Sequence, residues 1–474
     1  MAVSVVDAEK RDLIDRIMDR LKKGYSVSLE APPGYGKTFI ASYVATELAP
    51  SIVITRTHAE ISEVVSMAGK KIAYAYGRPS ICKKMPRDSF SYSICRAFAS
   101  SGICRETVSR REIAYIAARV RSEKEIRDYR DACLYRAMKV YAEKARRASV
   151  TYDYVIANPS IVENKRVVIM DEAQKIIEIM VQSVEFTSPE RVSELSKLAR
   201  DESDRRLLYA FKAAMKRSAS TRDLISYFDK MSSWTGDSPL ASEIMGIVDA
   251  CLAGRCLYTG GILYYLPINI SINTLLSRKP LLAMGIMIPD IVSSRCDEAI
   301  RLGGRVIEAY IDDSINMRYS EREKIDINYL ANLAAKYIDK DGGNLVVTVN
   351  KRYADEISKI LTSKGYKMLS KEDIIAKRYM APGSVAVDVA GGSLTEGINI
   401  LGLTRVIVLG APYPSPSPEL DIAGKVVGNI YEKIAILRTA QAVGRIRGRG
   451  SAVLIDQRFR ELRNAMPKWM DIIN

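Results

Sequence analysis

The sequence predicts an α/β protein with two parallel-sheet domains, the first of which carries two insertions. Apolar strand-like runs alternate with helix-compatible stretches in residues 1–77 and again after residue 300, a rhythm typical of parallel sheets. A glycine-containing loop joins the first of these strands to a helix. The segments 78–150 and 181–275 lack this alternation and read mainly as helices. At 474 residues, the chain is long enough for about three domains.

The glycine-containing loop follows the apolar run Val27–Leu29 and precedes a helix-compatible segment. Its glycines let the backbone turn so that N–H groups converge on phosphate oxygens, and the helix start adds the positive end of its dipole. Lys37 can then reach the terminal phosphates, and the Thr38 hydroxyl can bind Mg²⁺. Ala31 departs from the glycine usual at the first position of such a loop. The residues expected to contact a nucleoside triphosphate are Pro33, Gly34, Tyr35, Gly36, Lys37 and Thr38.

An acidic pair follows a later strand-like run, Arg166–Met170. The pair is Asp171 and Glu172, and Ala173 and Gln174 come next. The carboxyl end of a buried strand is where nucleotide-bound Mg²⁺ is held in such folds. We expect Asp171 to hold the metal through water and Glu172 to polarise the attacking water. An ordinary strand that ends in acidic residues is the alternative, and the upstream phosphate-binding loop argues against it.

The charge of the chain indicates a polyanionic partner. The net charge is +15 and the pI is near 9.3. Between Cys82 and Arg147 there are 17 Lys and Arg against 8 Asp and Glu, a net charge of +9. A solvated basic face would have the same composition. No segment is long and apolar enough to span a membrane, and Met1–Lys10 lacks the apolar core of a signal peptide, so we expect a cytoplasmic protein.

The remaining elements can be placed in order along the chain. In the first domain we expect a helix at 7–23 and strands at Ser51–Thr55, Lys71–Tyr76, Tyr154–Ala157 and Lys279–Ile288. In the second we expect strands at Arg305–Tyr310, Asn344–Val349, Ser384–Val389, Arg405–Leu409 and Ser451–Ile455. The expected domains are 1–77 with 151–180 and 276–299, an insertion at 78–150, a helical insertion at 181–275, and 300–474.

Taken together, the motifs resemble those of the XPD/DinG branch of superfamily 2 helicases, over nearly the whole length. The resemblance rests on the order and spacing of six stretches: Leu29–Thr38 (motif I), Thr55–His58 (motif Ia), Asp171–Gln174 (motif II), Gly392–Asn399 (motif V), Gln441–Arg445 (motif VI) and Leu454–Phe459 after it. It implies two RecA-like domains with an iron–sulfur insertion and an arch-like helical insertion in the first. ATP would then lie between the RecA-like domains.

The resemblance also implies roles for single residues. Lys37, Asp171 and Glu172 would act on the phosphates, Mg²⁺ and water. The residues that it adds are catalytic Gln441, Arg445 and Arg447, with Glu396 and Gly397 at the nucleotide.

The family's iron–sulfur cluster lies between motifs Ia and II, where this chain has four cysteines: Cys82, Cys95, Cys104 and Cys133. Thiolates suit a 4Fe-4S cluster, whereas structural zinc usually shows tight cysteine pairs, which are absent here. Zinc or free buried thiols remain alternatives. The other three cysteines are expected to be plain core thiols: Cys251, Cys256 and Cys296.

The chain departs from the family pattern at several positions. Lys10 stands where the family has its adenine-reading Gln. Motif III reads Met284–Met287 and lacks the usual Ser and Thr hydroxyls. Asn399 replaces Asp at the end of motif V, and after Arg445 the next arginines are Arg447 and Arg449. These departures bear on nucleotide selectivity and coupling rather than on the fold.

The resemblance implies an ATP-driven translocase and helicase on single-stranded DNA, of 5′-to-3′ direction and with a role in repair. Its cofactors would be ATP, Mg²⁺ and the 4Fe-4S cluster. Its partners would be single-stranded DNA and tailed or forked duplexes, bound by a monomer that could also meet repair proteins. The weakened coupling motifs leave a second hypothesis, a DNA-binding ATPase switch that clamps or remodels without processive unwinding.

Overall fold

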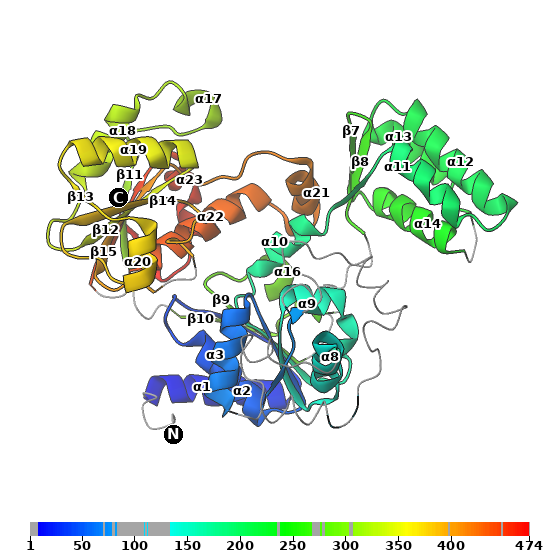
Figure 1. The fold of residues 1–474 in the computed structure, drawn as a ribbon, viewed down its shortest axis with the longest axis horizontal. Helices are drawn as coiled ribbons and strands as arrows, with labels where there is room; N and C mark the ends of the chain where they lie inside the picture. The colour runs from blue at the N-terminus through cyan, green and yellow to red at the C-terminus, as the bar shows by residue number, and fades with distance from the viewer. Residues whose placement is uncertain are drawn as a thin grey trace. The chain divides into compact units, whose positions relative to one another are not determined.

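In the computed structural model the chain forms two compact units, Met1–Leu29 with Gly36–Ile300 and Glu30–Tyr35 with Arg301–Asn474 (Figure 1). The residues that the structure describes are 8–69, 72–77, 81–82, 109, 111, 133–234, 238–267, 275–276, 280–302, 307–396, 399–446 and 449–473. Each unit contains a seven-stranded sheet. The predicted α/β class with two parallel sheets is confirmed.

The first sheet has the strand order β10-β1-β9-β5-β2-β4-β3. Its strands are β1 (Val27–Glu30), β2 (Ser51–Thr55), β3 (Ala73–Tyr74), β4 (Arg147–Thr151), β5 (Val167–Met170), β9 (Leu281–Gly285) and β10 (Glu298–Arg301). The pairings from β9 to β3 are all parallel. Every residue of β2, β5 and β9 is buried, because helices cover both faces of a parallel sheet, and this explains their continuous apolar runs.

Helices of the first unit pack around this sheet. They are α1 (Ala8–Lys22), α2 (Lys37–Glu47), α3 (His58–Ala68), α8 (Leu134–Lys144), α9 (Tyr152–Ala157), α10 (Lys175–Gln182) and α16 (Asp290–Ser293), with a 3₁₀ turn η4 (Pro159–Val162). Along α1 the buried residues recur at helical spacing, from Leu13 to Leu21, as the sequence predicts. No helix in the described part of the chain is long and apolar enough to cross a membrane.

A third, smaller sheet belongs to the segment between α10 and β9. It is antiparallel, in the order β6-β8-β7, with β6 (Glu185–Thr187), β7 (Cys256–Thr259) and β8 (Ile262–Tyr265). The helices that accompany it are α11 (Pro189–Glu194), α12 (Glu202–Arg217), α13 (Thr221–Asp229) and α14 (Pro239–Leu252), with the 3₁₀ turn η5 (Leu195–Leu198). Figure 1 shows these helices gathered beside β7 and β8. They share one hydrophobic core, which includes the stacked rings of Phe211 and Phe228.

The second unit holds a sheet in the order β13-β14-β12-β15-β16-β11-β17, and all of its pairings are parallel. Its strands are β11 (Ile307–Asp312), β12 (Gly343–Thr348), β13 (Lys367–Met368), β14 (Ser384–Val389), β15 (Leu403–Leu409), β16 (Ser451–Ile455) and β17 (Met470–Ile473). Its helices are α17 (Tyr319–Arg322), α18 (Ile327–Lys336), α19 (Lys351–Ser363), α20 (Lys371–Lys377), α21 (Pro418–Val427), α22 (Ile430–Val443) and α23 (Arg458–Leu462), followed by η6 (Arg463–Ala465).

Two predictions about the first unit are wrong. The strand expected at Tyr154–Ala157 is instead the helix α9, and the neighbouring strand is β4. The Thr151 hydroxyl accepts the N–H of Tyr154, so this residue ends the strand and caps the helix. The short apolar run that follows is compatible with either structure, and the cap decides for the helix.

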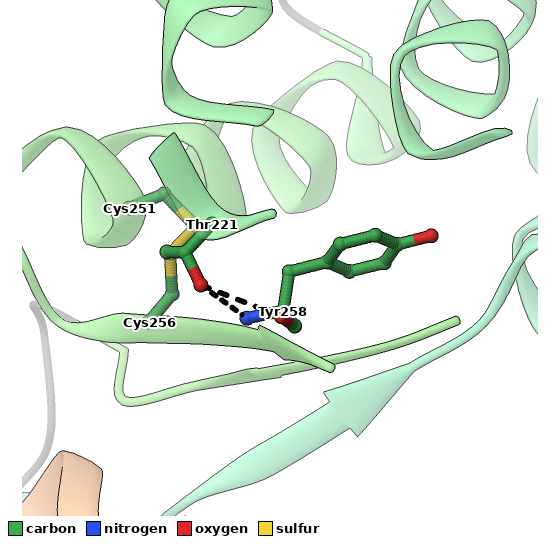
Figure 2. Close-up of a disulfide and its surroundings, with 4 residues drawn as sticks. All are labelled: Thr221, Cys251, Cys256 and Tyr258. Atoms are coloured by element: carbon green, nitrogen blue, oxygen red, sulfur yellow. Dashed lines mark hydrogen bonds between the residues drawn. A yellow bond between two sulfur atoms is a disulfide. The ribbon is translucent and has the colours of Figure 1, made fainter. Parts of the chain in front are cut away.

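The second error concerns Cys251 and Cys256, which form a disulfide and are not plain thiols (Figure 2). Cys251 lies in the last turn of α14 and Cys256 begins β7, and their Cα atoms are 4.9 Å apart. Gly254, with φ +74°, forms the turn that brings them together. The Tyr258 N–H also donates to Thr221 Oγ1 at 2.8 Å, which fastens β7 to the start of α13.

Candidate nucleotide-hydrolysis site

The loop after β1 has the backbone that the sequence predicts for a phosphate-binding turn. Gly34 and Gly36 have φ of +80° and +98°, values that side chains with a Cβ rarely adopt. Tyr35 N–H donates to the Pro32 carbonyl at 3.3 Å, which closes the turn. Gly36 is the N-cap of α2, and it has no side chain with which to cap this helix. The start of α2 can therefore present its N–H groups to an anion.

Lys37 and Thr38 begin α2 and face the acidic pair that follows β5. The Lys37 side chain is buried, and its Nζ lies 4.0 Å from Glu172 Oε1. The Thr38 hydroxyl donates to Asp171 Oδ2 at 2.9 Å. Thr38 and Asp171 are the two residues predicted to hold Mg²⁺, and their oxygen atoms are close enough to bind one ion. The strand order explains this meeting, since only β9 separates β1 from β5.

Asp171 is fully buried among charges of both signs. The pKa of its carboxyl group is raised to about 7, mainly by burial and further by the negative charges of Glu172 and Glu60. The positive charge of Lys37 and the hydrogen bond from Thr38 act in the opposite direction. A bound Mg²⁺ would favour the ionised form, because the cation adds positive charge beside the three carboxylates. The Tyr152 hydroxyl donates to the Asp171 carbonyl at 2.9 Å and fixes the backbone at this point.

Glu172 has a left-handed backbone, with φ +54°. Non-glycine residues in this conformation are strained and cluster at functional sites. The conformation turns the side chain toward Lys37 and also toward Gln174, whose Nε2 donates to Glu172 Oε2. Its side chain is partly exposed, so water can reach the carboxylate.

Glu60 is a member of this site that the motifs alone did not indicate. Its Oε2 accepts the N–H groups of Arg56 at 2.7 Å and Thr57 at 3.1 Å, so it holds the backbone of motif Ia after β2. Burial raises the pKa of its carboxyl group, as does the charge of Glu172, and the two N–H groups lower it. Thr57 followed three residues later by Glu60 is a capping-box signature, and this signal was available in the sequence.

The strand that ends in motif III joins the acidic loop through the backbone. Ala173 N–H donates to the Met284 carbonyl at 2.7 Å. Lys10, where the family has its adenine-reading Gln, lies near the phosphate loop. Its Nζ is 3.4 Å from the point that a Cβ on Gly36 would occupy. That Lys10 takes the place of the adenine-reading Gln stays a prediction.

In the second unit, motif V follows β14 and is held by a buried aspartate, Asp388. Its Oδ2 accepts the Leu394 N–H at 2.9 Å, and it pairs with Lys371. A Cβ on Gly392 would overlap this carboxylate, which explains the glycine. No signal in the sequence indicated this role for Asp388. Glu396 is partly exposed, and Gly397 lies outside the described residues.

Motif VI lies at the end of α22. Gln441 is buried on this helix, and Arg445 Nε donates to the Gln441 carbonyl at 3.2 Å. The predicted catalytic Arg447 lies outside the described residues. The roles of these three residues stay predictions.

Two of the four predicted cluster cysteines are described. Cys82 and Cys133 are partly exposed and form no disulfide, and Cys133 is the N-cap of α8. Cys95 and Cys104 lie outside the described residues. Within the described ranges, no group of three or more His, Cys, Asp or Glu side chains could hold a metal ion. The four-cysteine cluster therefore stays a prediction.

Comparison with known proteins defines the class of this fold. Residues 337–472 match the family model of the helicase C-terminal domain. The solved structure named XPD Helicase is 18% identical, covers 97% of both chains and has a TM-score of 0.62. Xpd4 of S. tokodaii is 14% identical over 98% of this chain and 99% of its own, with a TM-score of 0.54. The structure named XPD APO is 17% identical over 95% of this chain and 97% of its own, with a TM-score of 0.52.

No curated protein sequence matches the chain. At these identities the structural matches establish the fold. The chain is thus an α/β protein whose second unit is similar, over residues 337–472, to the helicase C-terminal domain. Its fold is that of the solved XPD structures, so the resemblance that the motifs predict is confirmed at the level of the fold.

Proposed function

We propose that this protein is an ATP-driven helicase that translocates along single-stranded DNA. The observation that carries the proposal is the meeting of four side chains after β1 and β5 of an XPD-like fold: Lys37, Thr38, Asp171 and Glu172. These are a phosphate cation, two Mg²⁺ ligands and a carboxylate that can orient water, the parts that nucleotide hydrolysis requires.

In this proposal, Lys37 and the N–H groups at the start of α2 bind the phosphates. Thr38 and Asp171 hold Mg²⁺, which neutralises charge on the phosphate oxygens when it is bound. Glu172 orients the attacking water and accepts its proton. The motif resemblance adds Gln441, Arg445 and Arg447 as groups that stabilise transition-state charge, with Glu396 and Gly397 at the nucleotide.

The DNA partner is supported by charge and by motif Ia. The excess of Lys and Arg between Cys82 and Arg147 would contact phosphates, and Arg56 follows β2 in a turn that Glu60 holds rigid. By resemblance we also propose 5′-to-3′ travel, a role in repair, action as a monomer in the cytoplasm, and the four domains with the boundaries given above.

We further propose that Cys82, Cys95, Cys104 and Cys133 bind a 4Fe-4S cluster. Support comes from the thiol chemistry of the four side chains and from their place in the chain between motifs Ia and II. Protein purified without oxygen should be brown and contain about four irons per chain. Cys133→Ser should bleach it, whereas Cys296→Ser, at a cysteine outside this set that forms no disulfide, should not. Colourless wild-type protein with stoichiometric zinc would contradict the cluster.

The test of the proposed function is strand displacement measured beside ATP hydrolysis, on duplexes with a 5′ tail, a 3′ tail or none. We expect unwinding that requires ATP and a 5′ tail, and that Glu172→Gln abolishes. Lack of displacement on every tailed duplex would contradict the helicase.

A second function, an ATPase switch that clamps DNA, is favoured by one observation. Met284 and Ile286 in motif III cannot make the hydroxyl hydrogen bonds of the family pattern. DNA-stimulated hydrolysis without displacement would support this switch over the helicase.

A further inference from the structure

Gln174 has a buried side chain that the proposed chemistry leaves without a role. It follows Ala173 in the acidic loop, and its exposed fraction is 2%. Its Nε2 donates to Glu172 Oε2, while its Oε1 is buried and has no hydrogen-bond partner in the described part of the chain. A buried amide that is only half satisfied costs free energy and calls for an explanation.

The chemistry of the two side chains fixes the orientation of the amide. An ionised carboxylate only accepts hydrogen bonds, so the NH₂ group of Gln174 must face Glu172. The carbonyl Oε1 then points the other way, toward the end of β9. There it meets Gly285, where a Cβ would overlap the Oε1 atom and would also lie 3.0 Å from the Met287 carbonyl oxygen and 3.2 Å from Ile288 Cδ1. Glycine at this position leaves room for the amide.

The backbone ties the same two segments together. Ala173 N–H donates to the Met284 carbonyl at 2.7 Å, directly beside the Gln174–Gly285 contact. Glu172 itself is held in a left-handed conformation with Lys37 4.0 Å away. Without a second restraint, its carboxylate could turn toward the Lys37 ammonium and away from the position of an attacking water.

We propose that Gln174 is the positioning residue for Glu172, and that the lack of a side chain at Gly285 leaves space for the Gln174 amide. This inference rests on the proposed ATP hydrolysis. Gln174 holds the Glu172 carboxylate at one oxygen and braces its own amide against the end of β9. In this chain, the Gln174 amide packs beside Gly285. This contact connects motif II to motif III, in which Met284 and Ile286 have no hydroxyl group.

The test is a double-mutant cycle on ATP hydrolysis with Gln174→Ala, Gly285→Ala and both together. Each single variant should lower kcat about 10- to 100-fold and leave the KM for ATP within about 2-fold, because catalytic geometry is lost and phosphate binding is not. In the double variant, the shortened side chain at position 174 removes the closest neighbour of the new methyl group, and only the milder contacts with the Met287 carbonyl oxygen at 3.0 Å and Ile288 Cδ1 at 3.2 Å remain. Its kcat should therefore be close to that of Gln174→Ala alone.

Two further variants complete the design. Gly246→Ala adds a methyl group on α14, where no atom lies within 4 Å of the new Cβ, and should leave kcat unchanged. Gln174→Met keeps the shape of the side chain without its hydrogen bonds, so it should lose kcat like Gln174→Ala. It also carries the test if Gly285→Ala does not fold.

The inference is overturned if Gln174→Met and Gln174→Ala keep wild-type kcat, if they change KM and not kcat, or if the losses in the double variant multiply. Absence of ATP hydrolysis in the wild-type protein would instead contradict the proposed function, so the two failures are distinguishable.

Discussion

Each of the two parallel sheets has a strand that ends in a buried aspartate, and the two are built for different tasks. Asp456 follows β16 in the second unit, and its carboxylate accepts N–H groups of Ala411 at 2.9 Å and of Arg458 at 2.7, 2.9 and 3.1 Å. Asp171 follows β5 in the first unit. It accepts the Thr38 hydroxyl and the Glu172 N–H, and the carboxylates of Glu172 and Glu60 lie near it.

The surroundings of the two carboxylates distinguish a structural aspartate from a reactive one. Asp456 is neutralised by Arg458, which also donates to the Met317 carbonyl at 2.9 Å and the Ala411 carbonyl at 3.1 Å, so these two charges compensate each other. Asp171 is buried beside like charges, and its pKa is raised to about 7. A fold maintains such a cost where the group serves binding or chemistry.

The largest expected effect is on turnover. Glu172→Gln keeps the size of the side chain and one acceptor oxygen and removes its basicity, so kcat should fall about 100- to 10,000-fold with ATP affinity nearly unchanged. Single-turnover hydrolysis and equilibrium ATP binding measure the two quantities. A wild-type kcat in this variant would mean that Glu172, like Asp456, has no catalytic role.

The next effect is on stability. Asp456→Asn leaves Arg458 buried without its counter-charge and should lower the free energy of unfolding by about 3–5 kcal/mol, measured by urea denaturation. Asp171→Asn should leave the free energy of unfolding at pH 8 unchanged or raise it, although this variant loses activity. Equal destabilisation by both substitutions would contradict the view that Asp456 is a structural residue and Asp171 is not.

A pH series sharpens the same comparison. The pKa of Asp171 is 3.8 in an ordinary environment and about 7 in the fold, so between these values the folded state binds more protons than the unfolded state. Without Mg²⁺, this group therefore loses its stabilising contribution as the pH rises from about 4 to 7. The stability of Asp171→Asn relative to wild type should increase over that range, and a constant difference would contradict the shift.

The smallest expected effect concerns Lys10 and the choice between ATP and GTP. The Lys10 ammonium only donates, whereas a Gln amide both donates to and accepts from adenine. Wild type should therefore hydrolyse GTP at a rate within about 10-fold of ATP, and Lys10→Gln should shift the ratio toward ATP by a few-fold. Strict ATP selectivity in wild type would show that other residues read the base.

Local signals in the sequence were sufficient for much of the fold. β2, β14 and β16 begin and end where the apolar-rich runs predict, because the inner strands of a parallel sheet consist mostly of apolar residues. The glycine turn and the acidic pair also lie where their motifs place them. The strand at Tyr154–Ala157 was wrong because periodicity cannot distinguish a short buried strand from a short buried helix.

The contacts that tune the site were beyond the reach of sequence reasoning. Sequence reasoning placed Gln174 in motif II but gave it no role of its own. Nothing in the sequence connects it to Gly285, which is more than a hundred residues away. Asp388 and the Cys251–Cys256 disulfide were missed for a related reason. Their partners are set by the packing of loops and not by a periodic pattern.

Phosphate release from ATP shows directly whether DNA stimulates a hydrolysis site formed by Asp171, Glu172, Lys37 and Thr38. The rate of phosphate release from ATP is followed with and without single-stranded DNA and Mg²⁺, in wild type and in Lys37→Ala. We predict hydrolysis that requires Mg²⁺, rises with DNA and is almost absent in Lys37→Ala. Equal rates in the two proteins, or no hydrolysis in wild type under any of these conditions, would contradict the proposed site.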